Sequence, residues 1–258
     1  MTLRLSRGQV ARAFGMALVA AIAAGCAEVP KDPAAKAAYE EANDPLEPMN
    51  RAIFDFNITA DKAVIKPVAK AYRWALPEFF RTSIRNFLNN AKSPVVFIND
   101  SLQGSPSRAG ETLMRFIVNT TAGMAGFFDV AGEYGMERHS EDFGQTLAVW
   151  GVGEGPYLML PIFGPSNVRD TVGRVADSFM DPFSYLMANN GLDYMLIGMA
   201  VTDGIDQRSR NIEALDDIEK NSLDFYATLR SLYRQNRRSE ILNGKVENIP
   251  VPEIKDSD

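Results

Sequence analysis

The sequence predicts an all-α fold made of amphipathic helices. Apolar residues recur at helical spacing in most segments of the chain. Glycine and proline are dense enough to forbid a long helix only in residues 151–165 (GVGEGPYLMLPIFGP). No stretch after the N-terminal segment approaches the roughly 18 continuous apolar residues of a membrane-spanning helix. We therefore expect helices that do not cross a bilayer individually.

The N-terminus has the pattern of a lipoprotein signal peptide, residues 1–25. Arg4, Arg7 and Arg12 precede an apolar stretch at residues 14–24, and the only cysteine, Cys26, follows Ala-Ala-Gly. Cys26 is thus the predicted lipidation site, and residues 26–43 are a predicted acylated tether. An ordinary secretory signal or an uncleaved anchor is the alternative. Ala27 follows the cysteine, and similarity to proteobacterial lipoproteins implies that the absence of Asp there favours the periplasmic leaflet of the outer membrane.

Composition limits the partners of the mature chain. Without the signal peptide, 24 basic side chains face 33 acidic ones, which argues against a nucleic-acid partner. Hydrophobic residues make up 46% of the chain, more than a periplasmic domain of this size needs for its own core. Part of the apolar surface is expected to face lipid, so we expect a membrane-associated protein.

The first predicted helix begins at Asp44, taken as the capping carboxylate, and ends where Pro67 stops it. Its apolar face covers more than half of its circumference, which fits either a buried helix or a helix in the membrane interface. Two further helices are predicted, at residues 77–90 and 94–102.

Ser105 and Pro106 have the pattern of a cap and first position of a helix whose apolar face continues to residue 131. Gly123 and Gly126 could allow close approach of another backbone, kink this helix or divide it in two. Residues 151–165 predict an apolar loop or short hairpin.

Helical spacing resumes at residues 169–176, 192–212 and 219–238. The arginines at the end of the last helix are expected to form a solvated face. Residues 44–243 make up the predicted helical domain, and residues 244–258 a flexible C-terminal tail.

No catalytic or metal-binding set is evident in the sequence. His139 is the only histidine and lies in a polar run that ends at Ser140, a predicted helix cap. Acylation would occupy Cys26, and the acidic residues do not follow calcium-loop spacing. We therefore expect no enzyme activity, no cofactor and no metal. A membrane-surface lipid hydrolase that uses His139 is the alternative.

Three segments carry a family resemblance. Residues 44–57 (DPLEPMNRAIFDFN), 115–132 (RFIVNTTAGMAGFFDVAG) and 143–170 resemble, in the same order, the signature blocks of the MlaA (VacJ) lipoproteins. The resemblance implies a ring-shaped helical bundle, embedded in the membrane, with a central amphipathic channel. It implies that the protein removes mislocalised phospholipids from the outer leaflet of the outer membrane. The implied partners are phospholipid, a trimeric outer-membrane porin and the periplasmic carrier MlaC.

The same blocks supply the candidates for contact with lipid or for the channel wall. Met49, Ile53, Phe54 and Phe56 are assigned to lipid contact or core, with Asn50, Arg51 and Asn57 as polar groups that fix the segment. The channel wall and its gate are assigned to residues 115–128 and 151–165, with these candidates: Phe116, Met124, Phe127, Phe128, Tyr157, Leu158 and Phe163. Ordinary packing is the alternative role for each. An envelope scaffold lipoprotein that does not handle lipid is the alternative function.

Overall fold

The computed structural model describes residues 30 and 32–244, and it is predominantly helical, as predicted. The signal peptide, Cys26 and the tail beyond residue 244 lie outside the described residues. Helices and one hairpin follow one another along the chain: α2 (Pro33–Ala42), α3 (Glu47–Ala60), η1 (Asp61–Ile65), α4 (Lys66–Ala75), α5 (Glu78–Leu102), α6 (Pro106–Thr121), α7 (Val130–Glu133), α8 (Phe143–Val149), β1 (Tyr157–Leu160), β2 (Gly164–Asn167), α9 (Val168–Met180), α10 (Pro182–Asn189), α11 (Asp193–Arg210), α12 (Ile212–Asn221) and α13 (Phe225–Ile241).

The first long helical run differs from the prediction at both ends. Asp44 is fully buried and does not cap α3, whose N-cap is Leu46. Pro67 does not stop the helix, because the π-helical turn η1 precedes it and the chain continues into α4. The Lys66 N–H donates to the Asp61 carbonyl, five residues back. The wider π turn places the proline at the start of α4, where its missing N–H is tolerated.

The two helices predicted at residues 77–90 and 94–102 are one helix, α5, with Pro94 inside it. Ser93 Oγ donates to the Asn89 carbonyl at 3.3 Å, beside the hydrogen bond that the proline cannot make. Packing against neighbouring helices keeps α5 continuous where the local sequence favours a break.

Helix α6 ends at Thr121, so of the alternatives for the two glycines the structure shows division. A Cβ at Gly123 would lie 2.3 Å from the Phe128 carbonyl oxygen, so only glycine fits this turn. Further on, Asp142 caps α8 by accepting from the Gln145 N–H, which corrects the predicted cap at Ser140. Asp142 directly precedes Phe143, the first residue of α8, and therefore occupies the N-cap position.

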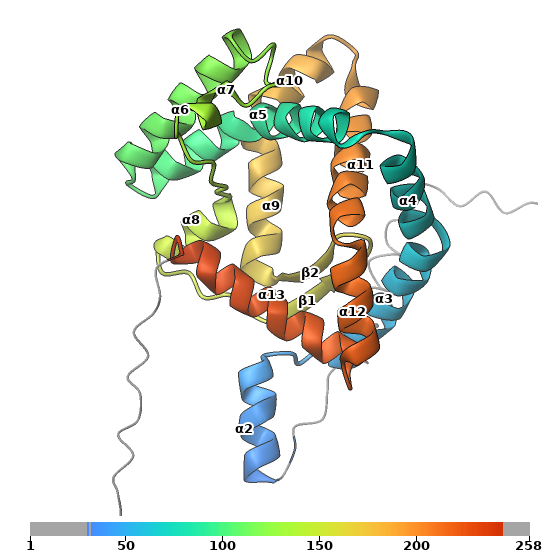
Figure 1. The fold of residues 1–258 in the computed structure, drawn as a ribbon. Helices are drawn as coiled ribbons and strands as arrows, with labels where there is room; N and C mark the ends of the chain where they lie inside the picture. Colours follow the sequence, from blue (N-terminus) through green and yellow to red (C-terminus); the bar gives the residue numbers. More distant parts are fainter. Residues whose placement is uncertain (1–29, 31, 245–258) are drawn as a thin grey trace, which may run out of the picture.

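The predicted hairpin is confirmed as the antiparallel pair β1 and β2, in which Tyr157 pairs with Asn167 and Leu160 with Gly164. The helices predicted at residues 169–176 and 192–212 correspond to α9, which extends to Met180, and α11. The helix predicted at residues 219–238 begins only at Phe225, because residues 219–221 belong to the end of α12 and residues 222–224 are not helical. Helix α2 lies within the segment predicted to be a tether, and it stands apart from the other elements in Figure 1.

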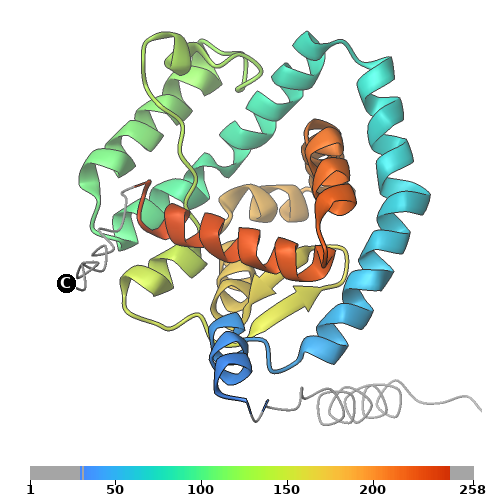
Figure 2. The same ribbon diagram turned by 60° about the horizontal axis from the view of Figure 1, so that its bottom comes forward.

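The elements form a closed circuit of contacts. Helix α4 packs against α11, α5 contacts α9 and α11, α9 contacts β2, and β1 contacts α3. Figure 1 shows α5, α9, α11 and the hairpin placed around the middle of the molecule, and Figure 2 shows α13 crossing in front of the hairpin from α12 toward α8. The central channel implied by the family resemblance remains a prediction.

The interior is unusually polar. Among the described residues, buried polar and charged side chains outnumber buried hydrophobic ones. The hydrophobic core is one small cluster around Phe54, Tyr157, Met159 and Tyr226, whose aromatic rings meet edge to face. Hydrogen bonds and ion pairs therefore determine much of how the helices are held together.

Candidate functional site

Asn50 joins the first signature segment to the hairpin. Its side chain is fully buried, and its Nδ2 donates to Asp44 Oδ1 at 2.8 Å and to the Tyr157 carbonyl at 3.1 Å. Its Oδ1 accepts from the Met159 N–H at 2.9 Å. Asn57, about two turns later, repeats this arrangement with the Leu160 carbonyl and a backbone N–H at the tip of the hairpin. One face of α3 thus fixes β1 through backbone contacts.

Asp44 ties the same segment to α13. Tyr226 donates its hydroxyl to Asp44 Oδ2 at 2.5 Å, and Arg230 Nη1 donates to the same oxygen at 2.7 Å. Burial raises the pKa of Tyr226, and the hydrogen bond to the carboxylate raises it further. Arg51 reaches the first residue before α13 by pairing with Asp224 at 2.6 Å, and its guanidinium lies 4.4 Å from the centre of the Tyr226 ring. The segment that opens the helical domain is thereby bound to its last helix.

The basic end of α13 is not the solvated face that the sequence predicted. Arg237 is buried and donates to Asp170 at 2.8 Å and to both oxygens of Asp142 at 2.6 and 2.7 Å. Burial alone would raise the pKa of each carboxyl group, but the hydrogen bonds and charge of Arg237 outweigh it and lower both pKa values. Arg237 is buried because it binds Asp142 and Asp170, which are distant in sequence, whereas Arg238 is exposed as expected.

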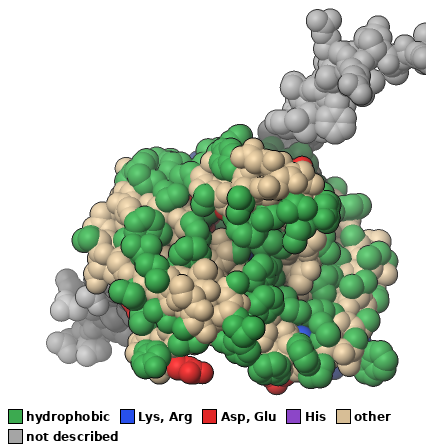
Figure 3. Space-filling model, turned by 90° about the horizontal axis from the view of Figure 1, so that it is seen from above, with side chains coloured by type: hydrophobic (Ala, Val, Ile, Leu, Met, Phe, Trp, Pro, Cys, Tyr) green, Lys and Arg blue, Asp and Glu red, His purple; other side chains and the backbone are tan. Residues whose placement is uncertain are grey.

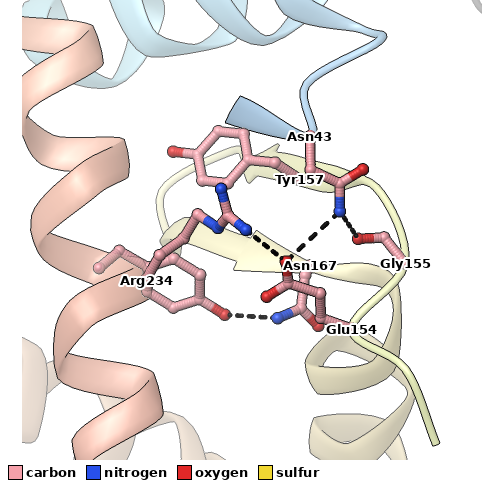
Figure 4. A pocket seen from close by; sticks show the side chains of 7 residues that line it. Asn43, Glu154, Gly155, Tyr157, Asn167 and Arg234 are labelled. Carbon is pink, nitrogen blue, oxygen red and sulfur yellow. Dashed lines mark hydrogen bonds and ion pairs between the residues drawn. The ribbon is translucent and has the colours of Figure 1, made fainter. Parts of the chain in front are cut away.

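A small polar cluster closes the junction between the hairpin, α13 and the end of α2. Figure 4 shows Arg234 and Asn43 converging on Glu154, with hydrogen bonds of 2.7 and 3.4 Å. Asn43 also donates to the Gly155 carbonyl at 2.7 Å. Gly155 adopts a φ of +67°, a backbone conformation that favours glycine, and a Cβ there would lie 3.1 Å from the Val168 side chain.

The sequence-predicted lipid and channel candidates divide by burial. Asn50, Phe54 and Tyr157 belong to the core, with exposed fractions of 8% or less. Arg51 and Asn57 are half-buried, as are four apolar candidates: Met49, Ile53, Phe116 and Leu158. The exposed candidates are Phe56, Met124, Phe127, Phe128 and Phe163. For lipid contact the exposed group is the relevant one, because the core residues present no surface.

An extensive hydrophobic surface accompanies these exposed candidates. Figure 3 views the side on which α5, α6 and α10 lie in Figure 1, and hydrophobic side chains cover most of it while charged ones lie at its edge. Trp74 is 88% exposed. Phe79, at the start of α5, contacts Phe128, in the turn between α6 and α7, with ring centres 6.2 Å apart. Sequence analysis missed other exposed members on α4, α5 and α9–α11: Val68, Phe80, Phe179, Tyr185, Leu186, Tyr194 and Ile197. Helical spacing of apolar residues identifies the apolar face of a helix but does not show whether this face points to the protein interior or to the surface. The sequence alone therefore did not predict that these residues are exposed.

His139 occupies a structural position. Its Nε2 lies 3.0 Å from Asp100 Oδ2 and 3.2 Å from Thr112 Oγ1, and the Thr112 hydroxyl donates to Asp100 at 2.8 Å. A nucleophile relay needs the histidine to bridge acid and hydroxyl through its two different ring nitrogens. Here both contacts involve the same nitrogen, so the arrangement is not that of a relay.

These features define a class: helical, membrane-associated proteins with polar groups turned inward and apolar side chains outward. None of the helices in the described ranges is long and apolar enough to span a bilayer. Residues 42–240 match the family model of the MlaA lipoprotein. The chain belongs to the MlaA lipoprotein family.

Individual relatives agree with this assignment. The chain is 35% identical over 237 residues to the intermembrane phospholipid transport system lipoprotein MlaA of Escherichia coli, covering 90% of this chain and 89% of that one. The protein of the same name from Haemophilus influenzae is 32% identical, with 84% and 88% covered. A solved structure described as "Structural basis for maintenance of bacterial outer membrane lipid asymmetry" superposes with a TM-score of 0.70 at 37% identity, covering 77% of this chain and 98% of that chain.

Proposed function

We propose that this protein is the lipoprotein of a phospholipid transport system. It removes mislocalised phospholipids from the outer leaflet of the outer membrane and passes them to a periplasmic carrier, which maintains lipid asymmetry. It acts from the periplasmic leaflet, anchored by acylated Cys26, beside a trimeric porin and with the soluble carrier MlaC as acceptor. The role is that of a conduit and involves no catalysis.

The observation that carries this proposal is the inverted distribution of side chains. Buried polar groups outnumber buried hydrophobic ones, while large apolar side chains such as Trp74 are exposed. In water this arrangement would leave a large hydrophobic surface unsatisfied, whereas a bilayer covers it. A lipid headgroup is costly to move through hydrocarbon, so a conduit in a membrane needs polar groups inside and apolar groups outside.

Lipid crosslinking in cells tests direct handling of phospholipid. Photo-crosslinkers at the exposed candidates Met124 and Phe163 are expected to yield phospholipid adducts. A crosslinker at Lys220, an exposed position on α12, is the matched control. Adducts at Lys220 alone, or at none of the three positions, would contradict the proposal and favour a scaffold that does not handle lipid.

A genetic assay tests the transport role and the anchor together. Outer-leaflet phospholipid is expected to rise in a deletion strain and to return to its normal level with the wild-type gene. Cys26→Ala removes the acylation site, so it is expected to restore asymmetry poorly although the protein still folds. Normal asymmetry in the deletion strain would refute the transport role, and full rescue by Cys26→Ala would refute the need for the anchor.

A further inference from the structure

The surface of α9 that neighbouring elements leave uncovered is divided lengthwise into an apolar line and a polar line. The apolar line consists of residues at helical spacing with exposed fractions between 42% and 69%: Val168, Val172, Val175 and Phe179. The polar line runs beside it with the same spacing and consists of Thr171, Arg174 and Ser178. A surface of this kind fits a ligand that has both an apolar and a polar part.

The other side of α9 packs against α8. A Cβ at Gly173 would lie 2.3 Å from the Gly144 nitrogen, and Asp177 accepts from the Phe143 N–H at 3.1 Å. Figure 1 shows α8 on one side of α9 and α11 on the other. The apolar line therefore points away from α8, toward the side of α9 on which α11 lies.

The tip of the hairpin brings an exposed aromatic ring to Arg174. Phe163 lies between β1 and β2 and is 72% exposed. The guanidinium carbon of Arg174 lies over this ring, 5.5 Å from its centre. A guanidinium held over an aromatic ring keeps the N–H donors at its edge free for another partner. The ring thus positions a cation beside the apolar line without neutralising it.

The positive charge of Arg174 has no counterion in the described part of the chain. Its guanidinium makes no hydrogen bond or ion pair there. The carboxylates one turn before and one turn after it on α9 are bound elsewhere. Asp170 accepts from Arg237 at 2.8 Å, and Asp177 accepts from Asn99 at 2.9 Å. Arg174 is therefore available to an anion from outside the protein.

We propose that Arg174 binds the phosphate of a phospholipid whose acyl chain lies along the apolar line of α9. A phosphodiester supplies the negative charge that Arg174 lacks, and the edge of a guanidinium matches its oxygens. From Val168 to Phe179 the apolar line is about 16 Å long. This length is close to the hydrocarbon thickness of one leaflet, roughly 15 Å. The inference rests on the proposed function and specifies which residues bind the headgroup and the acyl chain.

The test uses the purified full-length acylated protein in detergent micelles, titrated with fluorescent dioleoyl phosphatidylglycerol. Arg174→Gln is expected to weaken binding by about ten-fold, the effect of losing one charge-assisted hydrogen bond. Phe163→Leu keeps an apolar side chain but removes the ring beneath the guanidinium, so it is expected to weaken binding by about two- to five-fold. Arg238→Gln makes the same charge change on exposed α13 and is expected to leave binding unchanged.

Competition with unlabelled lipids separates the headgroup from the acyl chains. The wild-type protein is expected to bind phosphatidylglycerol about ten-fold more tightly than dioleoylglycerol, which lacks phosphate. In Arg174→Gln this preference is expected to disappear while dioleoylglycerol binds as before, which also shows that the variant is folded. Val172→Asn, in the middle of the apolar line, is expected to weaken the binding of both lipids by about five-fold.

Four results would overturn the inference in distinguishable ways. A preference for phosphate that persists in Arg174→Gln would refute the headgroup site and leave the proposed function intact. Unchanged binding of both lipids in Val172→Asn would show that the acyl chain lies elsewhere. Displacement of the lipid by inorganic phosphate at the same concentration as by phosphatidylglycerol would assign Arg174 to free phosphate. No binding of either lipid to the wild-type protein would contradict the proposed function as well.

Discussion

Replacing Asn50 with aspartate tests whether this one side chain fixes the hairpin to the first helix. The substitution keeps the shape and the acceptor for the Met159 N–H, but it removes both donated hydrogen bonds. Asp44 and the Tyr157 carbonyl would lose a buried donor, and the new carboxylate would face Asp44. Each buried group left unpaired costs about 1–3 kcal/mol, so the expected loss in the free energy of unfolding is roughly 2–6 kcal/mol.

Thermal unfolding followed by circular dichroism in detergent measures this loss, at roughly 2–4 °C in Tm per kcal/mol for a chain of this size. The control is Asn221→Asp, which alters an exposed side chain bonded to the Asp217 carbonyl on α12 and is expected to cost at most about 1 kcal/mol. Repulsion between two buried carboxylates raises their pKa values in the folded variant. At neutral pH the free energy of unfolding of Asn50→Asp is expected to be lower than that of Asn50→Leu, which carries no charge at this position. This difference is expected to shrink as the pH falls and the carboxylates are protonated. Equal Tm values for Asn50→Asp and Asn221→Asp would refute this role of Asn50.

Three further predictions concern helix packing and charge. Gly173→Ala places a Cβ 2.3 Å from a backbone nitrogen of α8 and is expected to destabilise the protein by about 1–3 kcal/mol. In the control Gly204→Ala the new Cβ has nothing within 4 Å, so this variant is expected to be stabilised by about 0.5–1 kcal/mol. The same Tm shift in both variants would contradict this prediction. Arg237→Ala leaves Asp142 and Asp170 without their main cation and is expected to cost about 3–5 kcal/mol in denaturant unfolding, so a loss below about 1 kcal/mol would show that the pairs are dispensable. Because the folded-state pKa values of Asp142 and Asp170 are lowered, the stability that these carboxylates contribute is present above about pH 4 and is lost as the pH falls further. If the free energy of unfolding falls with acidification as steeply in Arg237→Ala as in wild type, the ion pairs of Arg237 are not the cause of this pH dependence.

Local patterns identified most of the elements and one of the connections. Helical spacing indicated the helices, and the glycine and proline density of residues 151–165 indicated the hairpin. Boundaries failed where tertiary contacts outweighed local preference. Pro67 and Pro94 lie within helical runs, because a π turn accommodates the first and neighbouring helices hold the second. Asp44 is of a residue type that often caps helices, but its carboxylate binds Tyr226 and Arg230 of α13, which are remote in sequence.

By itself, the sequence determined the helical fold class, the family and the polar role of Asn50, Arg51 and Asn57, because these depend on composition, spacing and motif order. Only the tertiary structure decided which apolar faces point outward and which arginines are buried. Arg237 and Arg238 are neighbours of one type, yet one is buried between two carboxylates and the other is exposed. Whether an arginine is buried here depends on the cost of its desolvation and on the carboxylates that offset this cost. The carboxylates that bind Arg237 lie about 70 to 95 residues away in the sequence, so no local pattern predicts them.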